Sequence, residues 1–107
     1  MTRSRYTIYQ TLIDIDSCNS KIICAKIIEE RACDLFYEDK ILIDEYENEG
    51  GDGWDEFRYS KAKFYLQSDT ECYQRDIRKR MKLEKELRLL NLRLKKLQNI
   101  RDHNLTS

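Results

Sequence analysis

The stretch SDTECYQRDIRKRMKLEKELRLLNLRLKKLQNIR, residues 68–101, decides how the rest of the chain is interpreted. Its leucines follow one another in steps of four and three residues, which is the spacing of a coiled-coil seam. The stretch contains no glycine or proline, and residues 68–71 have the S-x-x-E form of a helix N-terminal capping box. The sequence therefore predicts one long helix over 68–103, followed by a short tail over 104–107.

The leucine seam predicts that this helix pairs with another one. A charged helix of such length is marginal in water unless something covers its apolar side chains. We expect it to form a homodimer, or an antiparallel helical hairpin with another chain, while packing against the chain's own N-terminal domain is the alternative. The residues expected to make the dimer contact are Leu83, Leu87, Leu90, Leu94 and Leu97.

Basic side chains precede and overlap the seam, and they suggest contact with nucleic acid. The candidate residues are Arg75, Arg78, Lys79, Arg80, Lys82 and Lys85. A basic helix that leads into a leucine seam resembles the layout of bZIP proteins, whose basic helices cross the DNA major groove. Residues 69–77 contain no asparagine of the kind that reads a base there. The competing interpretation is a solvated helix face with opposite-charge pairs such as Asp76–Arg80 and Glu84–Arg88.

The N-terminal residues 5–15, RYTIYQTLIDI, are rich in threonine and isoleucine, which favours a strand. Ile8, Tyr9, Leu12 and Ile13 would also share one face of a helix, so periodicity alone does not decide, and we favour the strand. The short polar side chains of residues 16–20 predict a turn, and the apolar pattern after them predicts a helix over about 21–37.

The three glycines of the chain cluster at Gly50, Gly51 and Gly53, between two apolar or aromatic runs. Glycine tolerates the positive φ values that tight turns need, so residues 41–47 and 56–66 are predicted to form an antiparallel hairpin. The predicted fold class is α+β. A small antiparallel sheet with one short helix would fill residues 1–67, and the long coiled-coil-like helix would follow.

The tip of this predicted hairpin is strongly acidic. Residues 44–56 hold seven carboxylates and no Lys or Arg, and Trp54 lies among them. Such a surface is suited to a protein partner with a basic surface, with Trp54 as an anchor, and it could also imitate the phosphates of DNA. A solvated loop with Trp54 folded back is the alternative. The candidate partner-binding residues are Asp44, Glu45, Glu47, Glu49, Asp52, Trp54, Asp55 and Glu56.

Charge and cysteine usage limit the classes of protein to which this chain can belong. Net charge is zero, but residues 1–67 carry nine Lys/Arg against fourteen Asp/Glu, and residues 68–107 carry eleven against six. The four cysteines form no C-x-x-C pair, and no signal peptide or membrane span is evident, so we expect a cytoplasmic protein with reduced and mostly buried thiols. The sequence contains no catalytic motif or metal-ligand set, so we expect neither an enzyme, nor a cofactor, nor membrane association.

Two functional hypotheses follow. The first is a non-enzymatic regulator or inhibitor that acts through the acidic hairpin and dimerises through its C-terminal helix, in the style of phage or viral effectors. The second is a dimeric nucleic-acid-binding regulator. Its predicted order of elements resembles that of small dimeric winged-helix regulators, in which 41–43 and 57–66 would form the wing and 6–14 the first helix.

Overall fold

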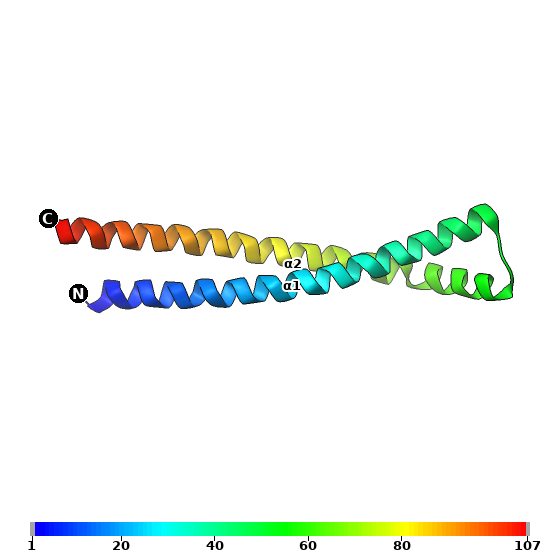
Figure 1. The fold of residues 1–107 in the computed structure, drawn as a ribbon, viewed down its shortest axis with the longest axis horizontal. Coiled ribbons are helices and arrows are strands. Elements are labelled where there is room, and N and C mark those ends of the chain that lie inside the picture. Colours follow the sequence, from blue (N-terminus) through cyan, green and yellow to red (C-terminus); the bar gives the residue numbers. More distant parts are fainter. Residues whose placement is uncertain (1, 107) are drawn as a thin grey trace. The chain divides into compact units, whose positions relative to one another are not determined.

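A computed structural model describes residues 2–106 of the chain, and the side chains of residues 7–104. Helix α1 spans Thr2–Glu49, helix α2 spans Gly53–Thr106, and residues 50–52 join them (Figure 1). Every described residue outside that linker is helical. The predicted α+β fold with an antiparallel sheet is therefore wrong, and the protein is a helical hairpin.

The segments that were expected to be strands are helical because their apolar residues fit the helical repeat. Ile8, Ile15 and Ile43 lie on the side of α1 that is buried or half-buried. Burial on that side outweighs the small cost of β-branched residues in a helix. The segments assigned to a wing are helical too, so the winged-helix element order is not present.

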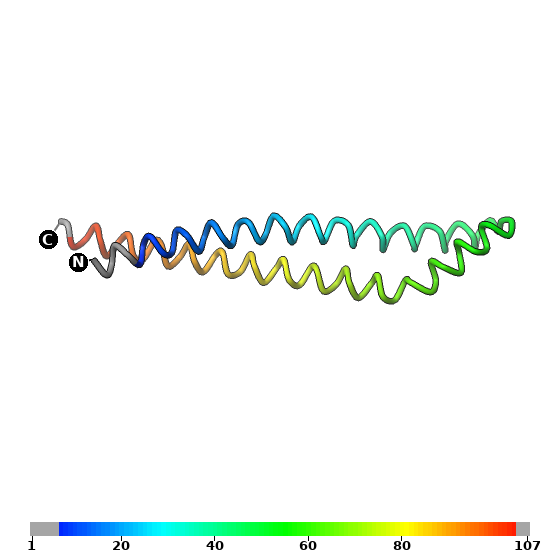
Figure 2. Tube along the Cα trace, turned by 90° about the horizontal axis from the view of Figure 1, so that it is seen from below, coloured from blue at the N-terminus to red at the C-terminus, as the bar shows by residue number. Residues whose placement is uncertain are grey.

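The chain divides into two compact units, and each contains a piece of both helices. Unit 1 consists of Met1–Cys24 and Arg80–Ser107, and unit 2 consists of Ala25–Lys79. Within each unit the α1 segment lies beside the α2 segment and runs in the opposite direction (Figure 2).

Unit 1 is held together by two seams of side chains that follow the heptad spacing. The α1 seam is polar or small at some positions: Ile8, Thr11, Ile15, Cys18 and Ile22. The α2 seam is the row of predicted leucines: Leu83, Leu87, Leu90, Leu94 and Leu97, all half-buried. The Cys18 thiol donates to the carbonyl oxygen of Leu83 at 3.4 Å, and buried Thr11 donates to the carbonyl oxygen of Thr7 at 2.7 Å. The buried polar groups of this seam are thereby satisfied.

Unit 2 continues the same three-and-four spacing with aromatic and small residues. The rings of Phe36 and Tyr73 lie 5.6 Å apart, and those of Tyr46 and Tyr59 stack at 4.5 Å. Ala32 and Ala62 are buried, so the two helix backbones can approach closely here. The Tyr59 hydroxyl donates to Glu47 Oε1 at 2.8 Å and fixes the last turn of α1 against α2.

A different helix cap lies at each end of the linker. Gly50 has φ +69° and its N–H donates to the carbonyl oxygen of Tyr46 at 2.8 Å, which is a left-handed helix C-terminal cap. The Asp55 N–H donates to Asp52 Oδ1 at 3.0 Å, while the Asp52 N–H donates to Asp55 Oδ2 at 3.2 Å. This reciprocal pair is a capping box, and it starts α2 at Gly53.

The predicted helix start at Ser68 is wrong, because α2 passes through it without a break. Within the helix, Ser68 is exposed and the neighbouring Thr70 donates to the carbonyl oxygen of Leu66 at 2.7 Å. The segment 16–20, which was expected to form a turn, is also helical. Ser20 Oγ donates there to the carbonyl oxygen of Asp16 at 3.2 Å. Short hydroxyl side chains are tolerated inside a helix when they bond to the preceding turn in this way.

Candidate functional site

The eight predicted partner-binding residues all lie around the linker, within unit 2. Asp44, Glu45, Glu47 and Glu49 occupy the last turns of α1, and Trp54, Asp55 and Glu56 occupy the first turn of α2. All are exposed except Asp55, which is half-buried. We call this set, together with Asp52 in the linker, the acidic tip. The acidic tip was predicted to lie on two strands, and it lies instead at the ends of two helices.

Three members of the acidic tip also hold the turn together. Asp52 and Asp55 form the capping box, and the hydrogen bonds that Asp52 accepts from Asp55 keep the pKa of the Asp52 carboxyl below its usual value. Glu47 accepts the hydrogen bond of Tyr59. The exposed carboxylates of Asp44, Glu45, Glu49 and Glu56 are better placed to meet a partner, because none of them takes part in these local bonds.

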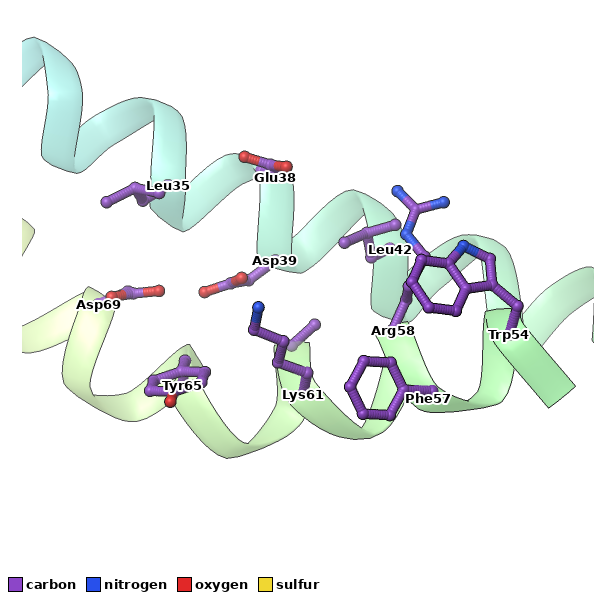
Figure 3. Close-up of a pocket in the computed structure, with 11 residues that line it drawn as sticks. Leu35, Glu38, Asp39, Leu42, Trp54, Phe57, Arg58, Lys61, Tyr65 and Asp69 are labelled. Carbon is purple, nitrogen blue, oxygen red and sulfur yellow. The ribbon is translucent and has the colours of Figure 1, made fainter.

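A half-open groove of about 440 Å³ lies beside the acidic tip (Figure 3). Trp54 and Phe57 stack on each other at one end, with ring centroids 5.6 Å apart and planes at 24°. Both remain exposed, at 65% and 58%. The other lining side chains are Leu35, Glu38, Asp39, Leu42, Arg58, Lys61, Ala62, Tyr65 and Asp69. An exposed aromatic pair above a groove is the kind of feature that anchors a partner.

Two carboxyl groups, those of Asp39 and Asp69, face each other across the helices at the far end of the groove (Figure 3). Burial raises the pKa of Asp39 from 3.8 to about 7, and the hydrogen bond to Asp69 and the charges of Asp69 and Glu38 act in the same direction. Asp39 Oδ2 is buried with no hydrogen-bond partner among the described residues. This end of the groove can therefore take up a proton near neutral pH, or accept a donor from a bound cation.

The heptad spacing contains a signal for this carboxyl pair that was not recognised. Asp39 lies three residues after Phe36, and Asp69 lies four residues before Tyr73, so both fall on the heptad seam. The pair went unnoticed because Asp39 was placed in a break after the predicted helix 21–37, and Asp69 was placed in the predicted capping box at the start of the helix 68–103.

The six basic residues are divided between the two units. Arg75, Arg78 and Lys79 belong to unit 2, and Arg80, Lys82 and Lys85 belong to unit 1. Arg80 is half-buried and its Nη1 lies 3.1 Å from Glu84 Oε1, while Arg75 Nε lies 3.6 Å from Asp76 Oδ1. The other four are exposed. Arg80 and Glu84 are thus one helical turn apart, whereas Arg75 and Asp76 are neighbours in the sequence.

The five seam leucines are brought together along one side of α2, as the spacing predicts. Within unit 1 they face α1, which covers them from inside the same chain. A covering helix was expected in a second chain, because the predicted helix was too long for a small domain of the same chain to cover its leucines. Helix α1 supplies the cover that the leucines need.

The four cysteines of the chain differ in burial. All four thiols are free, and only Cys18 is buried while Cys24 is exposed, so the expectation of mostly buried thiols is wrong. Within the described residues, no three His, Cys, Asp or Glu side chains come together as metal ligands would. Neither described helix has a stretch that is long and apolar enough to cross a membrane.

Comparison with known proteins gives no relative. No family model, no curated protein and no solved structure matches this chain. The function is therefore argued from the site alone.

Proposed function

We propose that the protein is a non-enzymatic interaction module that binds a partner with a basic surface through the acidic tip. The observation that carries this proposal is the exposed Trp54–Phe57 stack, which lies among exposed carboxylates and beside the groove. Aromatic anchors supply most of the binding energy of many interfaces, while surrounding charges steer the encounter. A module of this kind would regulate or inhibit the protein that it binds.

The charge of unit 2 supports a basic partner. Residues 25–79 carry nine Lys/Arg against fifteen Asp/Glu, a net charge of −6. A field of one sign raises the association rate with an oppositely charged protein and weakens as salt rises. The groove adds a specific contact, because Asp39 and Asp69 can accept hydrogen bonds from a Lys or Arg side chain of the partner.

The proposal is tested with a variant in which Glu45, Glu49 and Glu56 are changed to Gln. These residues are exposed and outside the capping box, so the helical fold should persist in circular dichroism. The matched control neutralises three exposed carboxylates elsewhere, Asp34, Glu71 and Glu86. Affinity capture from cells that express the protein should recover a basic protein with the control and lose it with the tip variant.

Trp54→Ala provides the second arm of this test. It should weaken binding of the captured protein by roughly tenfold or more if Trp54 is an anchor. A captured protein that binds both the tip variant and Trp54→Ala as tightly as the unmodified chain would refute the proposal.

A second candidate function is nucleic-acid binding through α2. Its support is the exposure of Arg78, Lys79, Lys82 and Lys85, together with the charge of unit 1, which has eleven Lys/Arg against five Asp/Glu, a net of +6. A mobility-shift titration should then show binding that falls steeply with salt and is weakened in Lys82→Ala/Lys85→Ala. Absence of any shift at low salt would remove this candidate.

We also propose that the protein is a homodimer in the cytoplasm. The free thiol of Cys24 is exposed, and exposed thiols persist in a reducing compartment. The predicted dimer contact is the seam of Leu83, Leu87, Leu90, Leu94 and Leu97, which are half-buried within unit 1.

A further inference from the structure

The solvent side of α2 in unit 1 combines basic and apolar side chains and carries no acidic one. The heptad that places Leu83, Leu90 and Leu97 in the seam defines this side by its b, c and f positions, which a pair of coiled helices leaves to solvent. Nine residues between 81 and 99 take these positions, and all nine are exposed. We call them the basic outer face.

Five of the nine residues are basic, and nothing in unit 1 neutralises them. The two acidic residues of α2 in this range, Glu84 and Glu86, stand at e and g positions beside the seam, and Glu84 is paired with Arg80 at 3.1 Å. None of the five basic side chains forms an ion pair with a described residue. Their charge is therefore available to an anionic ligand. The five are Lys82, Lys85, Arg88, Lys95 and Lys96.

Three large apolar side chains lie among these charges. Met81, Leu89 and Leu92 are each 57% exposed. Leu92 has Arg88 one turn before it and Lys96 one turn after it, so apolar and basic groups alternate along the same face. A nucleic-acid backbone offers charge alone and would leave the leucines in water. The ligand that suits this face is both anionic and apolar.

An anionic lipid surface meets both requirements. The apolar side chains of a helix that lies on a membrane enter the boundary between headgroups and acyl chains, while its Lys and Arg side chains stay with the headgroups. Each Lys or Arg held near an anionic membrane raises the affinity by roughly fivefold. The cytoplasmic leaflet is the anionic one, which agrees with the compartment proposed above.

The helix that carries this face is already formed. Helix α2 runs through residues 81–99 without a break, which gives the face a length of roughly 27 Å. Within unit 1 the seam holds α2 against α1, so binding does not have to supply the free energy of helix formation.

We propose that the basic outer face of α2 binds an anionic lipid surface, with this part of α2 lying in the plane of the membrane. A helix that rests on a membrane needs no stretch long enough to cross it. The expectation of no membrane association considered a spanning stretch and not this face. The proposed role is independent of the acidic tip, because the tip lies in unit 2.

The first test measures flotation of the full chain with lipid vesicles. The protein should float with vesicles of equal parts phosphatidylcholine and phosphatidylserine and should not float with phosphatidylcholine alone. The bound fraction should fall as salt rises, because the attraction is electrostatic. Absence of binding to the mixed vesicles at low salt would overturn the proposal.

The apolar part of the face is tested with Leu89→Ser/Leu92→Ser, which keeps every charge. Both side chains are exposed, so the helical circular dichroism should persist while affinity for the mixed vesicles falls by roughly tenfold or more. The matched control is Ile23→Ser/Ile27→Ser, two exposed apolar residues of α1, which should bind as the unmodified chain does.

The charged part is tested with Lys85→Gln/Arg88→Gln, which should also weaken binding by roughly tenfold or more. Lys21→Gln/Lys26→Gln, at exposed positions of α1, is the matched control and should have little effect. If the glutamine variant fails to bind while Leu89→Ser/Leu92→Ser binds as tightly as the unmodified chain, the face is a general polyanion site that nucleic acid would share. That outcome overturns the lipid proposal.

The second test asks which side of unit 1 enters the lipid. An environment-sensitive fluorophore is attached to a single cysteine, Leu92→Cys or Ser20→Cys, in chains whose native cysteines are serines. Ser20 is exposed at an f position of α1, on the other side of the helix pair. Mixed vesicles should shift the emission to the blue at position 92 and not at position 20, whereas equal shifts, or a shift at position 20 alone, would contradict the proposal.

Discussion

Asp39 shows how one residue of the seam can link stability to pH. It occupies a position that a coiled coil normally fills with an apolar side chain, and it faces a second carboxyl, Asp69. Glu38, Arg58 and Lys61 also line the groove around this pair. Burial dominates, and it keeps the protonated form of Asp39 favoured up to about pH 7.

We predict that Asp39→Asn stabilises the protein above neutral pH. In the folded chain Asp39 holds a proton up to about pH 7, whereas its ordinary pKa is 3.8, so folding takes up a proton between these values. The free energy of unfolding therefore falls as pH rises through this window. Thermal unfolding followed by circular dichroism should give a melting temperature a few degrees lower at about pH 8 than at about pH 5.

The variant should lose most of this difference, since asparagine does not titrate. Glu38→Gln is the control, because Glu38 is exposed and contributes only the smallest of the influences on Asp39. An identical pH dependence in the unmodified protein and in Asp39→Asn would contradict the account of this pair.

At the scale of the elements, Gly50 and Gly53 differ in how much their positions require a glycine. Gly50 has φ +69°, a conformation that residues with a Cβ rarely adopt, while Gly53 has no positive φ and open space around its Cα. We predict that Gly50→Ala lowers the free energy of unfolding by roughly 1 kcal/mol. Gly53→Ala should leave it unchanged or raise it slightly, and equal losses in chemical denaturation would argue against this cap.

The pairing of the helices depends on the α2 seam. We predict that Leu90→Lys, at a half-buried seam position of unit 1, destabilises the chain by roughly 2 kcal/mol. Met81→Lys, at a position 57% exposed, should change the free energy of unfolding by less than about 0.5 kcal/mol. Urea unfolding compares the two, and equal effects would mean that Leu90 does not face α1.

The sequence predicted the elements unevenly, for reasons that particular residues make plain. The leucines of α2 were found because five of them repeat without a polar interruption. The α1 seam was missed because Thr11, Cys18 and Asp39 break its apolar pattern, and because the threonine and isoleucine content of residues 5–15 favoured a strand. Of the four residues in 5–15 that were grouped on one helix face, Ile8 is buried, whereas Tyr9, Leu12 and Ile13 are exposed.

The glycine cluster was recognised as a turn but placed between strands, since glycine serves both kinds of turn equally well. Asp52-Gly53-Trp54-Asp55 has the same capping pattern as Ser68-Asp69-Thr70-Glu71, and only the first one starts a helix. The residues of the acidic tip lie together in the helical hairpin, as they would in the predicted β-hairpin, because they are close together in the sequence. The groove could not be predicted, since it depends on which residues of α1 lie opposite Trp54 and Phe57.

For the whole molecule, charge is separated by unit more sharply than by position in the sequence. Residues 1–67 carry a net charge of −5, and residues 68–107 carry a net charge of +5. The net charge of unit 2 is −6, and that of unit 1 is +6. The net negative charge of unit 2 supports a basic partner at the acidic tip. That interaction should weaken as salt rises.

These proposals all depend on the antiparallel pairing of α1 with α2 inside one chain. The most direct test replaces Tyr46 and Tyr59, whose rings stack at 4.5 Å, by cysteines in a chain whose native cysteines are serines. The control pairs Tyr46→Cys with Ser60→Cys, because Ser60 is exposed and one residue from the seam. Mild oxidation should close an intramolecular disulfide in the 46/59 chain and not in the control, whereas no closure, or equal closure in both chains, would contradict the pairing.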